Sequence, residues 1–205
     1  MVFVVIDGLD GSGKSTQAAR TRSFLEGFGF TVYLRSHPSD DNLFGRKTRQ
    51  YLYVEGRAAH MMSALFYLMD VMRSIIICPW RKYNVVIFVR YLMGTAYLPS
   101  PLHLIAYHFF AAVVPTSKLM FFLDVSPDVA KLRIRAERQR EEVFESLSEL
   151  KDVGKKALAL AMIGGWIVLD ANKPIKAVTE RLTQRISEEI LNHRTRRRLL
   201  CGGHA

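Results

Sequence analysis

The stretch that decides the fold is Gly8-Leu9-Asp10-Gly11-Ser12-Gly13-Lys14-Ser15. It matches the pattern G-x-x-x-x-G-K-[ST], and it lies between an apolar run at residues 2–6 and a segment with helical character. Glycines allow backbone N–H groups to turn inward around phosphates, and the N-terminus of the following helix adds partial positive charge. A glycine-rich turn without a ligand is the alternative, but the complete motif in this context favours a phosphate-binding loop.

This loop predicts a site for a nucleoside triphosphate and Mg²⁺. Lys14 is expected to reach the β- and γ-phosphates, and Ser15 is expected to place its hydroxyl on the metal ion. The residues expected to bind the triphosphate are Gly8, Asp10, Gly11, Ser12, Gly13, Lys14, Ser15 and Thr16. The loop alone does not say whether the triphosphate donates a phosphoryl group, is hydrolysed or is only bound.

Five short apolar runs predict the strands of a parallel sheet. They are rich in Val, Ile and Phe and alternate with helical patterns, which is typical of strands covered by helices on both faces. The runs lie at residues 2–6, 31–34, 84–89, 119–123 and 166–169. Because the 205 residues contain no long linker or repeat, we expect residues 1–205 to form a single three-layer α/β domain.

Serine, proline and glycine mark the expected helix ends. The first helix is expected to run from the loop to about Glu26, just before Gly27, and another from about residue 57 to residue 77. Ser100-Pro101 and Ser126-Pro127 each predict a serine N-cap followed by a proline in the first turn.

Composition narrows the range of partners. A formal net charge of +10 favours an anionic partner. The apolar stretches are far shorter than the roughly 18 residues of a membrane span, so no membrane partner is expected. The residues after Met1 lack a basic region and a cleavage site, so a cytoplasmic location is expected. Cys78 and Cys201 lie far apart without metal-ligand spacing, and no chemistry is assigned to them.

Three segments together resemble the thymidylate kinase family. They are the loop at residues 8–17, the pair Arg90-Tyr91 after the third apolar run, and an arginine cluster ahead of Phe144-Glu145. The resemblance covers nearly the whole chain. It implies a P-loop kinase fold with a lid at about residues 134–145, a homodimer, and an ATP-dependent transferase that converts dTMP to dTDP.

The resemblance also implies catalytic roles. The chain looks closest to family members with glycine at position 11, which take their catalytic arginines from a mobile lid. The residues expected to act in catalysis are Lys14, Arg90, Arg135, Arg138 and Arg140. A solvated helix with ion pairs four residues apart is the alternative for the lid segment.

The expected acceptor site depends on a stretch that reads aromatic-x-x-Asp-Arg in relatives, whose ring stacks on thymine and whose arginine binds the base. Here it reads Tyr67-Leu68-Met69-Asp70-Val71, so the arginine is absent. Phe66 could supply the ring if the register shifts by one, and Arg73 could replace the arginine; ordinary core packing is the alternative for both rings. Tyr97 is expected to crowd the 2′ position of the sugar. The residues expected to bind the acceptor are Asp10, Arg49, Phe66, Tyr67, Arg73, Arg90 and Tyr97.

Two positions depart from the family pattern. Relatives have an aspartate where this chain has Val89, and valine can neither hold a metal nor pair with Arg90. Relatives also read Arg-Glu-Pro where this chain has His37, which we interpret as a satisfied loop histidine. The alternatives are therefore an intact kinase, a nucleotide-binding protein with weak or no kinase activity, and a kinase for another nucleotide.

The expected metal ligands are Ser15, Asp10 and Glu145, with Asp7 as a further candidate. Asp10 could instead contact the 3′-hydroxyl of the acceptor, or face water as a turn residue.

The last expectations concern surfaces. The basic tail at about residues 193–205 is interpreted as a solvated helix end, and nucleic acid is not the expected partner. Leu104, Ile105 and Phe109 are candidates for dimer contacts, with core packing as the alternative.

Overall fold

A computed structural model of the protein describes residues 1–54, 56–137 and 146–201, apart from the side chains of Arg57, His60, Glu137 and residues 193–201. Of the predicted site residues, Arg138, Arg140 and Glu145 lie outside the described part of the chain.

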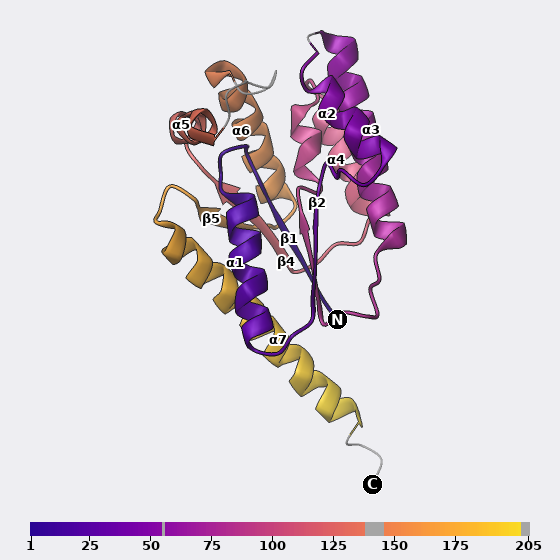
Figure 1. The fold of residues 1–205 in the computed structure, drawn as a ribbon, viewed down its shortest axis with the longest axis vertical. Helices are drawn as coiled ribbons and strands as arrows, with labels where there is room; N and C mark the ends of the chain where they lie inside the picture. The colour runs from indigo at the N-terminus through magenta and orange to yellow at the C-terminus, as the bar shows by residue number, and fades with distance from the viewer. Residues whose placement is uncertain (55, 138–145, 202–205) are drawn as a thin grey trace.

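A five-stranded parallel sheet with the order β2-β3-β1-β4-β5 forms the centre of the molecule (Figure 1). Its strands are β1 (Val2–Gly8), β2 (Val32–Ser36), β3 (Val85–Val89), β4 (Leu119–Asp124) and β5 (Ile167–Asp170). Every residue of β1 and β3 is buried, as their near-continuous apolar sequence requires in a sheet covered on both faces. The predicted α/β fold and its five parallel strands are thus confirmed, with bounds that shift by one or two residues.

Helices cover both faces of this sheet. They are α1 (Lys14–Gly27), α2 (Leu43–Tyr51), α3 (Arg57–Ile77), the 3₁₀ helix η1 (Met93–Tyr97), α4 (Leu102–Val113), α5 (Pro127–Glu137), α6 (Leu147–Ile163) and α7 (Ile175–Cys201). Figure 1 shows α1 and α7 side by side on one face. On the other face, η1 contacts α3, α4 and α6. No helix within the described residues is both long and apolar enough to cross a membrane.

Two details differ from the sequence-based expectations. The predicted N-cap at Ser100 is wrong, because α4 begins at Leu102 with Pro101 in the N-cap position, so that the serine lies one residue outside the helix. Helix α2 was not predicted. Its start is stabilised by Asn42, whose side chain accepts hydrogen bonds from the backbone N–H groups of Phe44 and Gly45.

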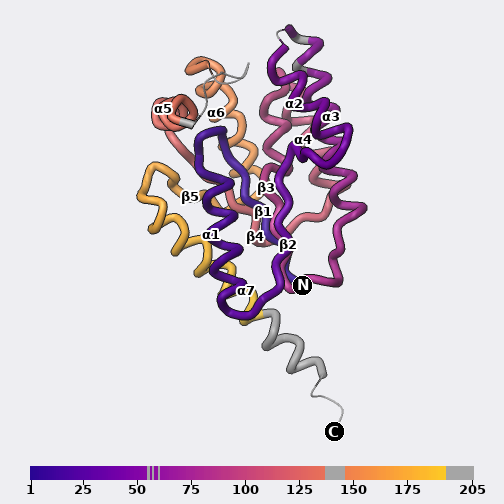
Figure 2. Tube along the Cα trace, in the orientation of Figure 1, coloured from indigo at the N-terminus to yellow at the C-terminus, as the bar shows by residue number. Residues whose placement is uncertain are grey.

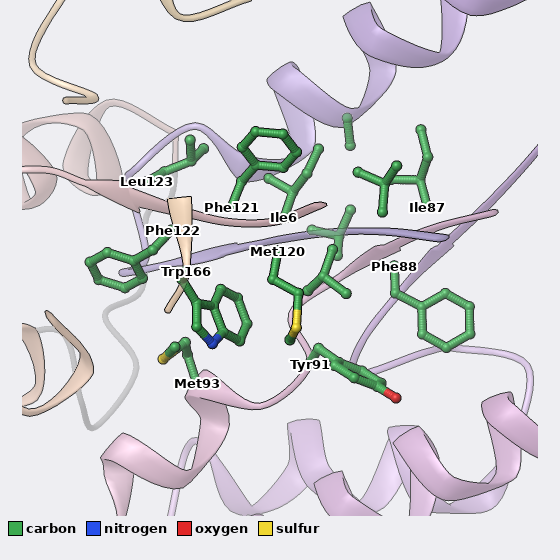
Figure 3. Packing of buried hydrophobic residues seen from close by; sticks show 14 of the residues in the cluster. Ile6, Ile87, Phe88, Tyr91, Met93, Met120, Phe121, Phe122, Leu123 and Trp166 are labelled. Carbon is green, nitrogen blue, oxygen red and sulfur yellow. The ribbon is translucent and has the colours of Figure 1, made fainter. Parts of the chain in front are cut away.

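The register between β1 and β3 determines which segments meet at the candidate site. Ile6 of β1 pairs with Val89 of β3, so the glycine-rich loop and Arg90 follow neighbouring strands at the same edge of the sheet. Figure 2 shows β1 and β3 at the centre of the trace. The core beneath them is tightly filled by side chains of β1, β3 and β4, among them Ile6, Ile87 and Phe121 (Figure 3). A rigid core therefore supports two segments that are far apart in the sequence.

Candidate active site

Two adjoining cavities lie at the carboxyl ends of β1 and β3. The loop cavity, of about 510 Å³, is lined by the glycine-rich loop and by residues of α5 and of the segments after β2 and β5. The tyrosine cavity, of about 110 Å³, has Tyr67 and Tyr97 in its wall. The residues that line both cavities are Asp10, Pro38, Arg49 and Arg90. Groups bound in the two cavities would therefore approach each other at these residues.

The loop leads directly into α1, with Gly13 in the N-cap position of the helix. Gly11 has a φ of 74°, and a Cβ at this position would lie 2.5 Å from the backbone oxygen of Ala130, so only glycine fits. Of the residues predicted to bind the triphosphate, Gly8 lines the tyrosine cavity and the other seven line the loop cavity. The hydroxyl of Ser12 is buried and has no hydrogen-bond partner among the described residues, which leaves it available to a phosphate oxygen.

Lys14 is buried beneath the loop. Its Nζ donates hydrogen bonds to the backbone oxygens of Gly8 at 2.9 Å and Leu9 at 2.5 Å. Burial lowers the pKa of Lys14 to about 8, and the charge of Arg90 acts in the same direction, whereas Asp10 opposes it. An anion in the loop cavity would favour the charged form of the lysine.

Asp10 is the centre of a charged cluster. Its Oδ1 lies 2.6 Å from Nη2 of Arg90 and 3.4 Å from Nζ of Lys14, and its Oδ2 accepts a hydrogen bond from the hydroxyl of Tyr97 at 3.2 Å. Its side chain is 16% exposed, so the alternative of a turn residue facing water does not hold. A carboxylate is tolerated beside a phosphate site here because two cations and a hydroxyl surround it.

Arg90 adopts an unusual backbone conformation. Its φ of 59° is the only positive value found for a residue other than glycine among the described residues. Burial acts to lower the pKa of the guanidinium, but the neighbouring Asp10 outweighs it, so the pKa is raised and the group stays charged. A cation is thus held at the boundary of the two cavities.

Asp7, a further candidate metal ligand, accepts hydrogen bonds from three backbone N–H groups. Its Oδ1 accepts from the backbone N–H of Gly8 at 2.9 Å, and its Oδ2 accepts from those of Tyr91 at 2.7 Å and Met93 at 3.1 Å. Burial raises its pKa, and these hydrogen bonds act against that shift. The carboxylate therefore ties β1 to the segment after β3.

The two candidate aromatic residues of α3 are separated by the structure. Tyr67 lines the tyrosine cavity, and its hydroxyl donates to the backbone oxygen of Tyr91 at 3.0 Å. Phe66 instead stacks on Tyr51 of α2, with ring centroids 5.8 Å apart, and lines neither cavity. The ring of Tyr67 packs over Gly94, where a Cβ would lie only 2.3 Å from its Cε1.

Arg73 is not brought to the cavities. Its Nη1 lies 3.5 Å from a carboxylate oxygen of Asp41, and it lines neither cavity. Asp70 is wholly buried and accepts hydrogen bonds from Ser39 and Asn42. This end of the aromatic-x-x-Asp stretch therefore holds α3 against the loop after β2, and the expectation that Arg73 contacts the acceptor is not supported.

Val89 and His37, which depart from the family pattern, are both wholly buried. Val89 lies between Ile6 and Ser36 in the sheet and carries no polar group. The Nδ1 atom of His37 lies 2.8 Å from the backbone oxygen of Arg90. The predicted satisfied histidine is thus found only in part: Nδ1 contacts Arg90, whereas Nε2 is buried and has no hydrogen-bond partner among the described residues.

The remaining arginines lie in different surroundings. Arg49 lines both cavities and forms an ion pair with Asp40 at 2.8 Å. Arg135 is exposed and lines neither cavity. Arg133, which the sequence analysis did not select, lines the loop cavity and donates to the backbone oxygens of Gly11 and Ala171. The sequence signal that could have identified Arg133 as a site residue is its position at the start of the arginine cluster.

The loop cavity is rich in positive charge. Among the described residues that line it, Asp10 is the only carboxylate. The cationic residues in its wall are Lys14, Arg49, Arg90, Arg133 and Lys173. The described residues also contain no cluster of three His, Cys, Asp or Glu side chains that could hold a metal by themselves. Such a wall suits a polyanion, and the oxygens of that polyanion would supply the further ligands that a metal ion needs.

Comparison with known proteins identifies the family of this chain. Residues 6–182 match the family model described as thymidylate kinase. A protein named "Probable thymidylate kinase" from Pyrobaculum calidifontis is 32% identical over 186 residues, which cover 87% of this chain and 92% of the relative. Proteins of the same name from Sulfurisphaera tokodaii and Pyrobaculum aerophilum are 29% and 31% identical; the matches cover 89% and 93% of this chain and 94% and 98% of the relatives. The chain belongs to the thymidylate kinase family.

Proposed function

We propose that this protein transfers the γ-phosphoryl group of ATP to the 5′-phosphate of dTMP, giving ADP and dTDP. The observation that carries the proposal is that the loop cavity and the tyrosine cavity meet at Asp10 and Arg90. A donor on the loop and an acceptor beside the tyrosines would then have their phosphates in contact with the same residues. Membership of the thymidylate kinase family supports this choice of donor and acceptor.

The chemistry fits the residues that line the site. An oxygen of the ionised acceptor phosphate attacks the γ-phosphorus, and the bond to the oxygen bridging the β- and γ-phosphates breaks. No general base is needed, because the attacking oxygen already carries the electron pair, and catalysis depends on positioning and on neutralising charge. Lys14 would bind the β- and γ-phosphates and Arg90 the acceptor phosphate. Arg135, Arg138 and Arg140 belong to the proposal as lid arginines, by family resemblance.

Mg²⁺ is part of the proposal. The hydroxyl of Ser15 and the carboxylate of Asp10 line the same cavity, and such hard oxygen donors suit this ion. Asp7 is a poor candidate, since its two oxygens already accept three backbone hydrogen bonds. Glu145 stays a predicted ligand. When bound, the ion would neutralise charge on the phosphates, and phosphate oxygens and water would have to supply most of its ligands.

The acceptor nucleotide would lie in the tyrosine cavity. Tyr67 is the better placed of the two predicted rings to pack on a base, and Tyr97 lies close to Asp10, where the sugar would be expected. Arg49, which lines both cavities, is proposed to assist Arg90 at the acceptor phosphate. Since Val71 is buried in the core, the base would be recognised without the arginine that relatives use there.

We also propose that the protein is a homodimer that acts in the cytoplasm. Ile105 and Phe109 of α4 are 62% and 61% exposed, whereas Leu104 packs partly against the core. A contiguous exposed apolar helix face commonly marks a contact with another protein. Sedimentation of the wild-type protein and of Ile105→Glu tests the proposed dimer, because the substitution is expected to produce monomers.

The kinase proposal is tested by a coupled assay of ADP release with ATP and a panel of nucleoside monophosphates. Preference for dTMP is the expected result, and equal turnover across the panel would remove the thymidylate assignment. The buried Val89 supports a second candidate, a nucleotide-binding protein without turnover. Calorimetric binding of ATP and dTMP with no product in the assay would favour that candidate.

A further inference from the structure

We propose that His37 is a positioning residue: through the backbone carbonyl of Arg90, it holds that arginine in the orientation from which its guanidinium contacts the acceptor phosphate. The inference rests on the proposed function and extends it to a residue outside the family pattern. Three observations support it: the positive φ of Arg90, the fixed position of the His37 ring, and the absence of a carboxylate at position 89.

The backbone of Arg90 needs support from its neighbours. A residue with a Cβ is disfavoured at a φ of 59° unless surrounding contacts hold it there. The amide of Arg90 donates to the backbone oxygen of Ile6 at 3.1 Å, which fixes one side of the residue to β1. The Nδ1 of His37 fixes the other side at 2.8 Å from the carbonyl oxygen. With both backbone groups held, the side chain projects toward Asp10.

His37 is itself held in place. Its backbone N–H donates to the oxygen of Val89 at 3.0 Å, next to the residue that its side chain contacts. Its ring packs edge-on against Phe88, with centroids 5.3 Å apart, and it has no exposed surface. A buried ring fixed in this way can impose an orientation on its hydrogen-bond partner.

The direction of the hydrogen bond follows from the partner. A carbonyl oxygen can only accept, so Nδ1 of His37 carries the proton and donates. Burial lowers the pKa of His37 to about 4, and the charge of Arg35 of β2 acts in the same direction, whereas Asp70 of α3 and the hydrogen bond to Arg90 oppose the shift. The ring is therefore neutral, and Nδ1 donates over the whole physiological pH range.

The rest of the site explains why this contact is needed. Val89 cannot pair with the arginine that follows it, so the side chain of Arg90 depends on Asp10 and its backbone depends on other segments. A carbonyl oxygen needs an N–H or O–H donor, which an ionised carboxylate or an apolar side chain at position 37 could not supply. Histidine supplies it through Nδ1.

Three substitutions of His37 test the proposal. His37→Asn keeps an N–H near the place of Nδ1, His37→Gln moves the N–H to the place of Nε2, and His37→Leu fills the space without a donor. We expect the KM for dTMP to rise about 10- to 100-fold in the Gln and Leu variants and to stay within about twofold of wild type in the Asn variant. His37 also lines the loop cavity, so the KM for ATP is measured beside it and should change less than the KM for dTMP in the Gln and Leu variants. Equal KM values for dTMP in the Asn and Gln variants would overturn the proposal, whether or not the Leu variant folds.

A matched control and a second measurement separate this result from general damage. His103→Leu removes another buried histidine, which lines neither cavity, and should leave the KM for dTMP unchanged. NMR of the arginine guanidinium groups reports the contact between Arg90 and Asp10 without any substrate. If wild type turns over no nucleotide, the proposed function fails, and the NMR arm still decides on His37. An unchanged Arg90 signal in the Gln variant would overturn the positioning role.

Discussion

The Nη2 atom of Arg90 lies 2.6 Å from Oδ1 of Asp10, although the two residues are 80 positions apart in the sequence. One belongs to the glycine-rich loop after β1, and the other follows β3, the strand that pairs with β1. The pair joins the loop cavity to the tyrosine cavity. The guanidinium of Arg90 is partly buried and needs a negative charge beside it. The carboxylate of Asp10 lies beside a phosphate site and needs a positive charge.

Asp10→Asn should lower kcat/KM for dTMP about 10- to 100-fold, as is common when a group that orients a site residue is lost. The amide keeps the size of the side chain but removes the charge that holds Arg90. Steady-state kinetics with dTMP as the varied substrate measure the effect. Asp152→Asn, which removes an exposed carboxylate paired with Lys156, is the control and should leave kcat/KM unchanged. Equal kinetics for the two variants would contradict a role for Asp10.

Val89→Asp should destabilise the protein by about 1–3 kcal/mol, because it places a carboxyl group in a fully buried strand position. If the missing acid limits the reaction, the same variant should raise kcat by roughly tenfold. Thermal unfolding measures the loss of stability, and the coupled assay measures the change in kcat. Val89→Asn has the same size without the charge, and a similar gain in rate from it would argue against a carboxylate effect.

Gly94→Ala should raise the KM for dTMP about 10-fold or more by displacing Tyr67, since a misplaced binding group can cost up to about 100-fold. A Cβ on residue 94 would lie 2.3 Å from the ring, which must therefore move. Gly27→Ala is a suitable control, because a Cβ at the end of α1 meets nothing within 4 Å. A normal KM for dTMP in the Gly94 variant would show that the base does not depend on the Tyr67 ring.

Tyr97→Ala should reduce the preference for deoxyribose over ribose by about 10-fold, the discrimination that a single steric contact commonly supplies. The preference is the ratio of kcat/KM for dTMP to that for its ribonucleotide analogue. Tyr97→Phe keeps the ring and loses the hydroxyl that bonds to Asp10, so it should retain the preference. If both variants discriminate as wild type does, another group excludes the 2′-hydroxyl.

Stability should decrease as the pH falls from about 6.5 to about 4. His37 has an ordinary pKa of 6.5 when unfolded and about 4 when folded, so the unfolded chain binds the proton more tightly in this window. This difference in proton binding contributes to the free energy of unfolding in full above pH 6.5, and the contribution is lost as the pH falls toward 4. Urea unfolding of wild type and His37→Asn at several pH values measures it. The Asn variant should show a flatter profile between pH 4 and 6.5, and parallel profiles would contradict the assignment.

The fold was largely predictable because its signals are local. Apolar runs such as the one in β3 identify strands, and a complete phosphate-loop pattern between a strand and a helix identifies the site without knowledge of the rest of the chain. The N-cap at Ser100 was misplaced by one residue, which is the usual error for a helix end.

The parallel sheet and the phosphate loop follow from the amino-acid sequence alone, because strand periodicity and loop conformation depend on adjacent residues. Three features of the site emerge only from the folded chain: Tyr67 and not Phe66 faces the cavity, Arg73 pairs elsewhere, and His37 contacts Arg90. These outcomes depend on which side of a helix meets the sheet and on hydrogen bonds between distant segments. The bond from His37 spans 53 positions, beyond the reach of any local pattern.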